Sequence, residues 1–304
     1  MMYLNCLISK YMKCILASLL VVLLVVSCGV MHREEDKKQV TVSIPAVAYF
    51  VERMSPELLE VNVMIPQSVG HSDYVLRPSQ LAQLSHSSSY LALGNLDFEI
   101  TWREKIFSVA KEIKWVDLSR GIDLIEGGCS HGEHHHGEHH HASDPHYWLS
   151  PKQAMLLTNN IAVSLKEILP NHVESIDSAK LVLLKEIESW HNKFDSISSS
   201  SVATGGVRRA FMIYHPSLSY LARDYGFSQY EIEKDGKEPT PKSLIEEIEK
   251  SVVDSVNIVF VQQGYDIQKA SVAAQQIGAQ VIEIAPEGYD WDTTMSTIYK
   301  ALKR

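Results

Sequence analysis

Short runs rich in β-branched and other apolar residues alternate with amphipathic stretches along the first part of the chain. Strand-like runs occupy 40–44, 59–65, 90–93 and 115–118, and helical spacing occurs at 46–54, 78–85 and 98–111. Strands that alternate with helices are typical of parallel βαβ units. The pattern therefore predicts an α/β lobe built on a parallel sheet.

The alternation stops in the middle of the chain and then returns. Ser150 can cap a helix over 151–169 whose first residue is Pro151. Pro170 interrupts it, and apolar residues then recur every three or four positions across 171–197, as on one face of a single long helix. After this helix, strands are predicted at 210–214, 229–232, 258–261 and 280–284, and helices at 217–224, 241–253, 267–277 and 291–302.

We therefore expect an α/β protein with two Rossmann-like lobes, each with a parallel sheet, joined by one long rigid linker helix. The expected N-terminal lobe spans 40–170, the linker helix 171–200 and the C-terminal lobe 201–304. A cleft between two lobes is a preferred place for a small ligand.

The N-terminus has the pattern of an export signal. Lys10 and Lys13 precede an apolar or small run over 14–27, which is shorter than the roughly 20 residues of a membrane-spanning helix. The run ends at Cys28, in a context that resembles a bacterial lipoprotein processing site. We expect a signal peptide over 1–27, acylation of Cys28 and a tether over 28–39. The alternative is an ordinary cleaved signal peptide with an incidental cysteine.

The net charge and the histidine content indicate which kind of ligand the protein binds. The formal net charge of −9 argues against a nucleic-acid partner. A segment over 127–143, rich in glycine and glutamate, is expected to be a loop and contains His131, His134, His135, His136, His139, His140 and His141. Imidazole favours zinc, copper and nickel, so this loop is predicted to bind metal weakly and adaptably; a solvated polar loop is the alternative.

Three other histidines stand apart in distinctive contexts. His71, His146 and His215 each lie at a predicted strand end or helix start, where side chains face the cleft of an α/β fold. Three neutral imidazoles suit a zinc-like ion and leave one position of a tetrahedron open. Asp73, Asp144 and Asp224 are close enough in sequence to orient the rings.

Several stretches resemble the zinc/manganese solute-binding proteins of bacterial ABC importers. The most specific are DPHYWLSP and YHPSLSYLARDYG; HSDYVLRPSQLAQLS, YLALGNLDFEITW and the histidine run are others. The resemblance covers about 40–302. It implies a two-lobed fold joined by a rigid helix, with His71, His146 and His215 as metal ligands and a membrane permease as the partner.

The sequence departs from the family at one position. The resemblance implies a fourth ligand from an aspartate after the last strand, but Ala285 occupies that position in IEIAPEGYDW. Glu287 or a water molecule could take its place. Loss of a carboxylate oxygen favours zinc over manganese, which prefers oxygen ligands.

The resulting hypothesis is an exported lipoprotein, periplasmic or at the cell surface, that captures Zn²⁺ and delivers it to an ABC importer. We expect a monomer. The alternatives are a manganese importer component, a metal-sequestering or adhesion lipoprotein, and a zinc hydrolase. A hydrolase is disfavoured because the chain has no H-E-x-x-H and no nucleophile motif.

Overall fold

A computed structural model describes residues 37–67, 69–71, 74–127, 143–203, 209–233 and 239–303, without the side chains of 200–203. The predicted signal peptide, Cys28, Asp73 and the histidine run lie outside these residues.

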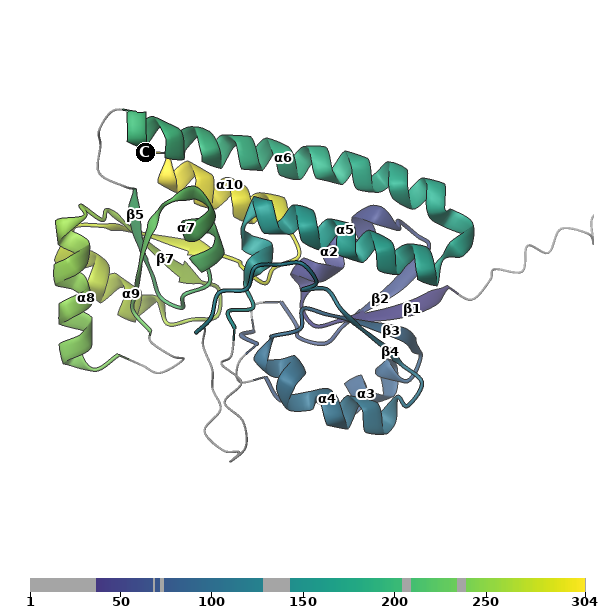
Figure 1. The fold of residues 1–304 in the computed structure, drawn as a ribbon. Coiled ribbons are helices and arrows are strands. Elements are labelled where there is room, and N and C mark those ends of the chain that lie inside the picture. Colours follow the sequence, from purple (N-terminus) through teal and green to yellow (C-terminus); the bar gives the residue numbers. More distant parts are fainter. Residues whose placement is uncertain are drawn as a thin grey trace, which may run out of the picture. The chain divides into compact units, whose positions relative to one another are not determined.

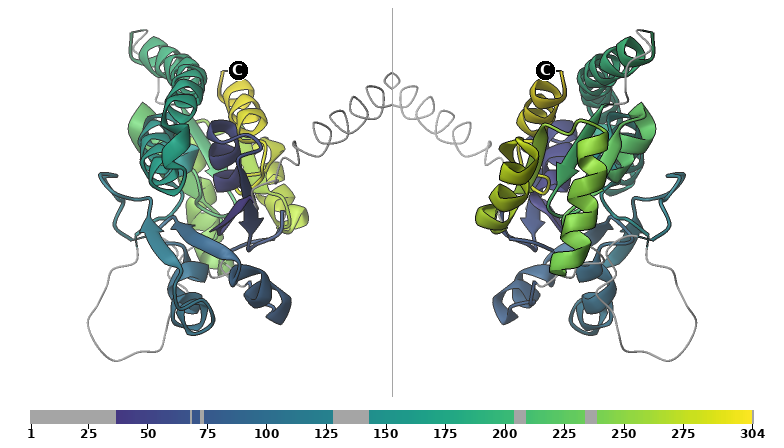
Figure 2. Two further views of the ribbon diagram at one scale, coloured as in Figure 1. Left: turned by 90° about the vertical axis from the view of Figure 1, so that its right-hand side faces the viewer. Right: turned by 90° about the vertical axis from the view of Figure 1, so that its left-hand side faces the viewer.

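The first half of the described chain forms a four-stranded parallel sheet in the order β2-β1-β3-β4. Its register places Val40 of β1 opposite Val61 of β2 and Ser89 of β3. Figures 1 and 2 show α5 and α2 on one face of this sheet and α3 and α4 on the other. The elements are β1 (Lys38–Val42), α2 (Pro45–Met54), β2 (Leu59–Val63), α3 (Pro78–Leu84), β3 (Ser87–Ala92), α4 (Asp97–Val109) and β4 (Lys114–Asp117).

The second half forms another four-stranded parallel sheet, in the order β6-β5-β7-β8. Both sheets thus place their second strand outside the first and their third and fourth on its other side. In such sheets the chain changes direction between the first and third strands, and ligands bind beyond the carboxyl ends at this point. The elements are β5 (Ala210–Ile213), α7 (Ser219–Tyr225), β6 (Ser228–Glu231), α8 (Pro241–Val253), β7 (Ile258–Gln262), α9 (Ile267–Ile277), β8 (Gln280–Ile284) and α10 (Trp291–Leu302).

Two long helices connect the sheets. After the short turn η1 (Tyr147–Leu149), α5 spans Pro151–Ile168; the turn η2 (Pro170–His172) then leads into α6, Val173–Ala203. At 31 residues, α6 is about 46 Å long. It packs against α2 and α5 from the first half and against α7 and α10 from the second (Figure 1).

The predicted apolar stripe is what attaches α6. Its buried members are Ile176, Leu183, Ile187, Trp190 and Phe194, and Ile197 extends the buried face beyond the predicted stripe. Val173 departs from the prediction because it begins the helix, and 38% of it is exposed. Two polar contacts flank the stripe: Arg53 of α2 binds both carboxylate oxygens of Glu186 at 2.7 Å, and Trp190 Nε1 donates to Asp292 Oδ1 at 2.6 Å. The expected α/β fold with two parallel sheets and a long connecting helix is confirmed.

The segment between β8 and α10 returns to the first half. Trp148 Nε1 donates to the carbonyl of Pro286 at 2.8 Å, and Trp291 Nε1 donates to the carbonyl of Trp148 at 2.8 Å. The backbone N–H of Ala46 donates to the Glu287 carbonyl at 3.0 Å. Phe50, Trp148 and Trp291 belong to one hydrophobic core. The two halves therefore share a core, although the sequence pattern predicts two separate lobes.

Among the helices that the structure describes, none combines the length and the apolar character needed to cross a membrane.

Candidate metal centre

The three isolated histidines meet between the two sheets. His71 lies in the loop after β2, His146 immediately before η1, and His215 two residues after β5. Their exposed fractions are 1%, 1% and 3%. One ring nitrogen from each lies within 4.8 Å of the others. Burial of three polar rings against one another is costly unless a ligand or hydrogen bonds satisfy them.

The spacing of the rings suits one metal ion. His71 Nε2 and His146 Nε2 are 3.1 Å apart. Two nitrogens bound to one tetrahedral zinc ion lie about 3.3 Å apart, given a Zn–N distance of about 2.05 Å. The ring centroid of His215 lies 6.1 Å from that of His71 and 5.2 Å from that of His146, so the three rings form a triangle. This triangle is the set of donors that the sequence predicts; its role as metal ligands stays a prediction.

Asp144 orients the His146 ring. Its Oδ1 accepts from His146 Nδ1 at 2.8 Å and from the His146 backbone N–H at 2.8 Å. Burial opposes ionisation of Asp144, but the contact with His146 outweighs it and lowers the pKa of the carboxyl. Burial also lowers the pKa of His146, against the pull of Asp144. The ring is therefore held neutral with its proton on Nδ1, which directs the Nε2 lone pair toward the other histidines.

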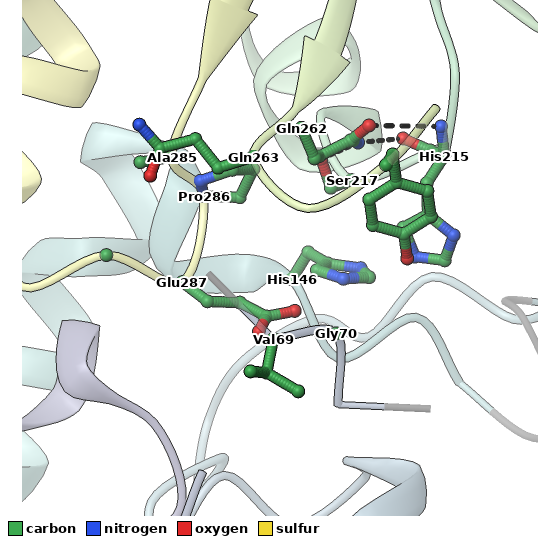
Figure 3. A pocket seen from close by; sticks show the side chains of 12 residues that line it. Val69, Gly70, His146, His215, Ser217, Gln262, Gln263, Ala285, Pro286 and Glu287 are labelled. Carbon is green, nitrogen blue, oxygen red and sulfur yellow. Dashed lines mark hydrogen bonds between the residues drawn. The ribbon is translucent and has the colours of Figure 1, made fainter. Parts of the chain in front are cut away.

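His215 is oriented by residues that the sequence analysis missed. Its Nδ1 lies 3.4 Å from Oε1 of Glu233, a buried carboxylate just after β6. Gln262, at the end of β7, accepts from the His215 backbone N–H at 3.3 Å and donates to the His215 carbonyl at 2.5 Å (Figure 3). Both lie at carboxyl ends of strands, a signal that could have identified them once the sheet order was known.

The prediction that Asp224 orients a ligand histidine is wrong. Asp224 accepts from Ser150 Oγ at 2.6 Å and from Gln153 Nε2 at 2.8 Å, and it pairs with Arg223. It therefore fixes the start of α5 against α7. Asp144 and Asp224 are both close to a histidine in sequence, so sequence distance alone did not show that only Asp144 contacts a histidine ring.

Glu287 is the carboxylate that pairs with the His71 ring in the part of the chain that the structure describes. Its Oε1 is 3.8 Å from His71 Nε2, and its carboxylate accepts the backbone N–H of His71. Burial raises the pKa of Glu287 to about 7, although the nearby charge of His215 lowers it. Glu287 thus lies where an oxygen ligand would be needed, two residues after the position that resemblance assigned to an aspartate.

A small cavity opens among these groups (Figure 3). This cleft cavity has a volume of about 20 Å³, close to the minimum that holds one water molecule or one ion. Its lining includes His146, His215, Glu287 and Ala285. Ala285 contributes no metal-binding atom. His71 is not among the residues that line the cavity, but its Nε2 lies 3.1 Å from Nε2 of His146, which does line it.

Two α/β halves joined by a long helix, with a small cavity between them, are an arrangement typical of solute-binding proteins. The family model described as "Zinc-uptake complex component A periplasmic" (ZnuA) matches residues 40–303. The chain belongs to this family, whose members are solute-binding components of zinc importers and not enzymes.

Individual relatives agree with this assignment. The chain is 27% identical over 274 residues to the high-affinity zinc uptake system protein ZnuA of Bacillus subtilis, covering 85% of this chain and 83% of that protein. It is 23% identical over 318 residues to the zinc-binding lipoprotein AdcA of Streptococcus pneumoniae, covering 97% of this chain and 61% of AdcA. A crystal structure of ZnuA superimposes with a TM-score of 0.76 at 29% identity, covering 87% of this chain and 97% of that chain.

Proposed function

We propose that this periplasmic importer component captures Zn²⁺ with a ring nitrogen of His71 and the Nε2 atoms of His146 and His215, and releases it to the permease of an ABC importer. The observation that carries the proposal is the approach of three buried imidazoles from three separate segments to within 4.8 Å. Binding and release require no chemistry on the ion. The family membership supports the importer as the partner.

The proposed fourth ligand is Glu287, with water as the alternative. A set of three nitrogens and one oxygen suits zinc in a tetrahedral site, whereas manganese favours oxygen ligands. The proposed set has three imidazole nitrogens and only one oxygen, which supports zinc over manganese. Competition of the two ions for the protein would test this preference, and equal affinities would contradict it.

The test compares His215→Ala with His172→Ala. His172 is exposed at the end of η2, just before α6, and does not line the cavity, so it is a control for loss of one imidazole away from the site. Chelator competition on the exported protein should show that His215→Ala weakens the tight zinc site by at least about 100-fold, since loss of even an outer partner of a ligand costs 10–100-fold. His172→Ala should leave it unchanged. Equal effects would contradict the assignment.

Two further elements of the proposal rest on the sequence. The seven histidines between 131 and 141 would collect zinc near the protein at lower affinity. A lipid on Cys28 would hold a monomeric protein at the membrane surface. Cell fractionation of a Cys28→Ser variant should move the protein from the membrane to the soluble fraction; retention at the membrane would contradict the anchor. Light scattering of the released protein would test the monomer.

A further inference from the structure

Two neighbouring cavities share a wall. The cleft cavity has a volume of about 20 Å³. A second cavity, here called the outer hollow, has a volume of about 670 Å³ and is lined by Tyr74, Val75, Leu76, Arg77, Pro78 and Gly264. Val69, Gly70 and Tyr265 line both cavities. Because 66% of Val75 is exposed, the outer hollow communicates with solvent.

Tyr265 forms the C-terminal half of this wall. It lies in the turn between β7 and α9, where its backbone N–H donates to the Gln262 carbonyl at 3.1 Å. Its ring stacks on that of His215, with centroids 5.7 Å apart and an interplanar angle of 28°. A Cβ at Gly70 would lie 3.5 Å from the Tyr265 hydroxyl oxygen. The side chain therefore reaches from the second half of the molecule to the loop that carries His71.

The volumes of the two cavities limit how many water molecules a bound ion can keep on each side of this wall. A cavity needs about 10–15 Å³ to hold one water, so the cleft cavity has room for about one, whereas an ion in solution carries about six. The outer hollow can hold the hydrated ion, and the cleft cavity cannot. An ion that enters the cleft cavity from the outer hollow therefore loses most of its waters as it passes Tyr265, Val69 and Gly70, which line both cavities.

We propose that Tyr265 is the gate between the outer hollow and the cleft cavity, and that it sets the rates at which zinc enters and leaves more than the affinity for zinc. The inference rests on the proposed binding of zinc by the three histidines. A gate lowers the association and dissociation rates together, because the ion crosses the same constriction in both directions. A residue that only positions His215 would instead change dissociation and affinity.

The experiment measures zinc association and dissociation by stopped flow with a zinc-chelating dye, on the full exported chain. Tyr265→Ala should raise both rates by about tenfold or more and change the equilibrium affinity by less than about threefold. Val69→Ala, on the opposite side of the wall, should raise both rates to a smaller extent. Tyr265→Phe keeps the ring but removes the hydroxyl that approaches Gly70, so it should raise both rates less than Tyr265→Ala does.

The matched control is Tyr230→Ala. Tyr230 and Tyr265 are both half-buried and pack against the same small core of the second half, but Tyr230 lines neither cavity. It should leave both rates unchanged. An unchanged association rate in Tyr265→Ala, with faster dissociation alone, would overturn the gate and leave a positioning role for Tyr265.

Failure of the gate and failure of the zinc site give different results. Zinc signals that persist in His146→Ala come from other sites and are subtracted. If the wild type shows no signal beyond that of His146→Ala, the proposed site itself is wrong. If it does show one, and Tyr265→Ala leaves both rates unchanged, only the gate is wrong.

Discussion

At the scale of single residues, the partner of each histidine decides what it can do. His146 and His215 each have a carboxylate beside the Nδ1 atom, from Asp144 and Glu233. Such partners fix the ring and its tautomer, so the other nitrogen is available to a metal ion. His191, by contrast, contacts the hydroxyl of Tyr225 on α7. His191 thus makes a contact between two helices, whereas His146 and His215 are held in orientations that suit metal binding.

Glu287 is the residue whose role is most open to test. We expect Glu287→Gln to weaken zinc binding by about 10–100-fold, because a neutral amide oxygen replaces a carboxylate that lies 3.8 Å from His71 Nε2. Glu283→Gln, at an exposed position of β8, is the control and should have no effect. The measurement is zinc affinity by chelator competition. An unchanged affinity in Glu287→Gln would indicate that water fills the fourth position.

At the scale of elements, the start of α4 is attached to the first sheet by a buried carboxyl group. Glu99, in the first turn of α4, accepts from the backbone N–H groups of Leu93 at 2.9 Å and Gly94 at 2.7 Å, and from the Ser43 hydroxyl. The Leu93 carbonyl in turn accepts from Tyr147, the neighbour of His146. These bonds link α4, β3 and the turn that carries one of the proposed ligands.

Burial raises the pKa of Glu99 from 4.5 to about 7, despite the hydrogen bonds that favour its ionised form. The folded state therefore retains a proton that the unfolded state releases above pH 4.5. The stabilising contribution of this proton is fully present below pH 4.5 and is lost as pH rises to about 7. We expect the free energy of unfolding of wild type, relative to Glu99→Gln, to fall by up to about 3 kcal/mol between pH 4.5 and 8.

Denaturant unfolding of the zinc-free protein at several pH values measures this difference. Glu104→Gln, at an exposed position of the same helix, should show no such trend. A difference between wild type and Glu99→Gln that does not vary with pH would show that Glu99 does not titrate in this range.

At the scale of the whole molecule, the proposed collecting loop is separable from the cleft. Its two ends are joined by a β-bridge between Glu126 and Ser143, and the backbone N–H of Asp144 donates to the Ile125 carbonyl at 2.9 Å. His71, His146 and His215 all lie outside the loop. We therefore expect the fold at the base of the loop to persist without residues 131–141.

Deletion of residues 131–141 should leave one tight zinc site per molecule and remove the weaker ones. The thermal midpoint of the zinc-free protein should change little, because the paired ends remain close. Titration calorimetry and thermal unfolding measure both outcomes. A variant with the seven histidines replaced by serine controls for loop length. Loss of the tight site on deletion would show that the loop supplies one of its ligands.

Much of the fold was predictable because hydrophobic periodicity reports local structure directly. The stripe on α6 is an example: the same spacing that predicts a helix also predicts the face that it buries. Helix starts were predictable where a proline marks them, as at Pro151. The shared core was not, because Trp148 and Trp291 are far apart in sequence and their contact leaves no periodic signal.

The sequence by itself determined two parallel α/β halves, a long connecting helix and the identity of three isolated histidines, because these depend on local patterning and residue chemistry. Only the tertiary structure decided which carboxylates contact these histidines. Asp144 and Glu233 contact the rings, Asp224 does not, and Glu287 reaches His71. The physical reason is that a hydrogen bond depends on distance in space, and strand order and chain return set that distance independently of sequence separation.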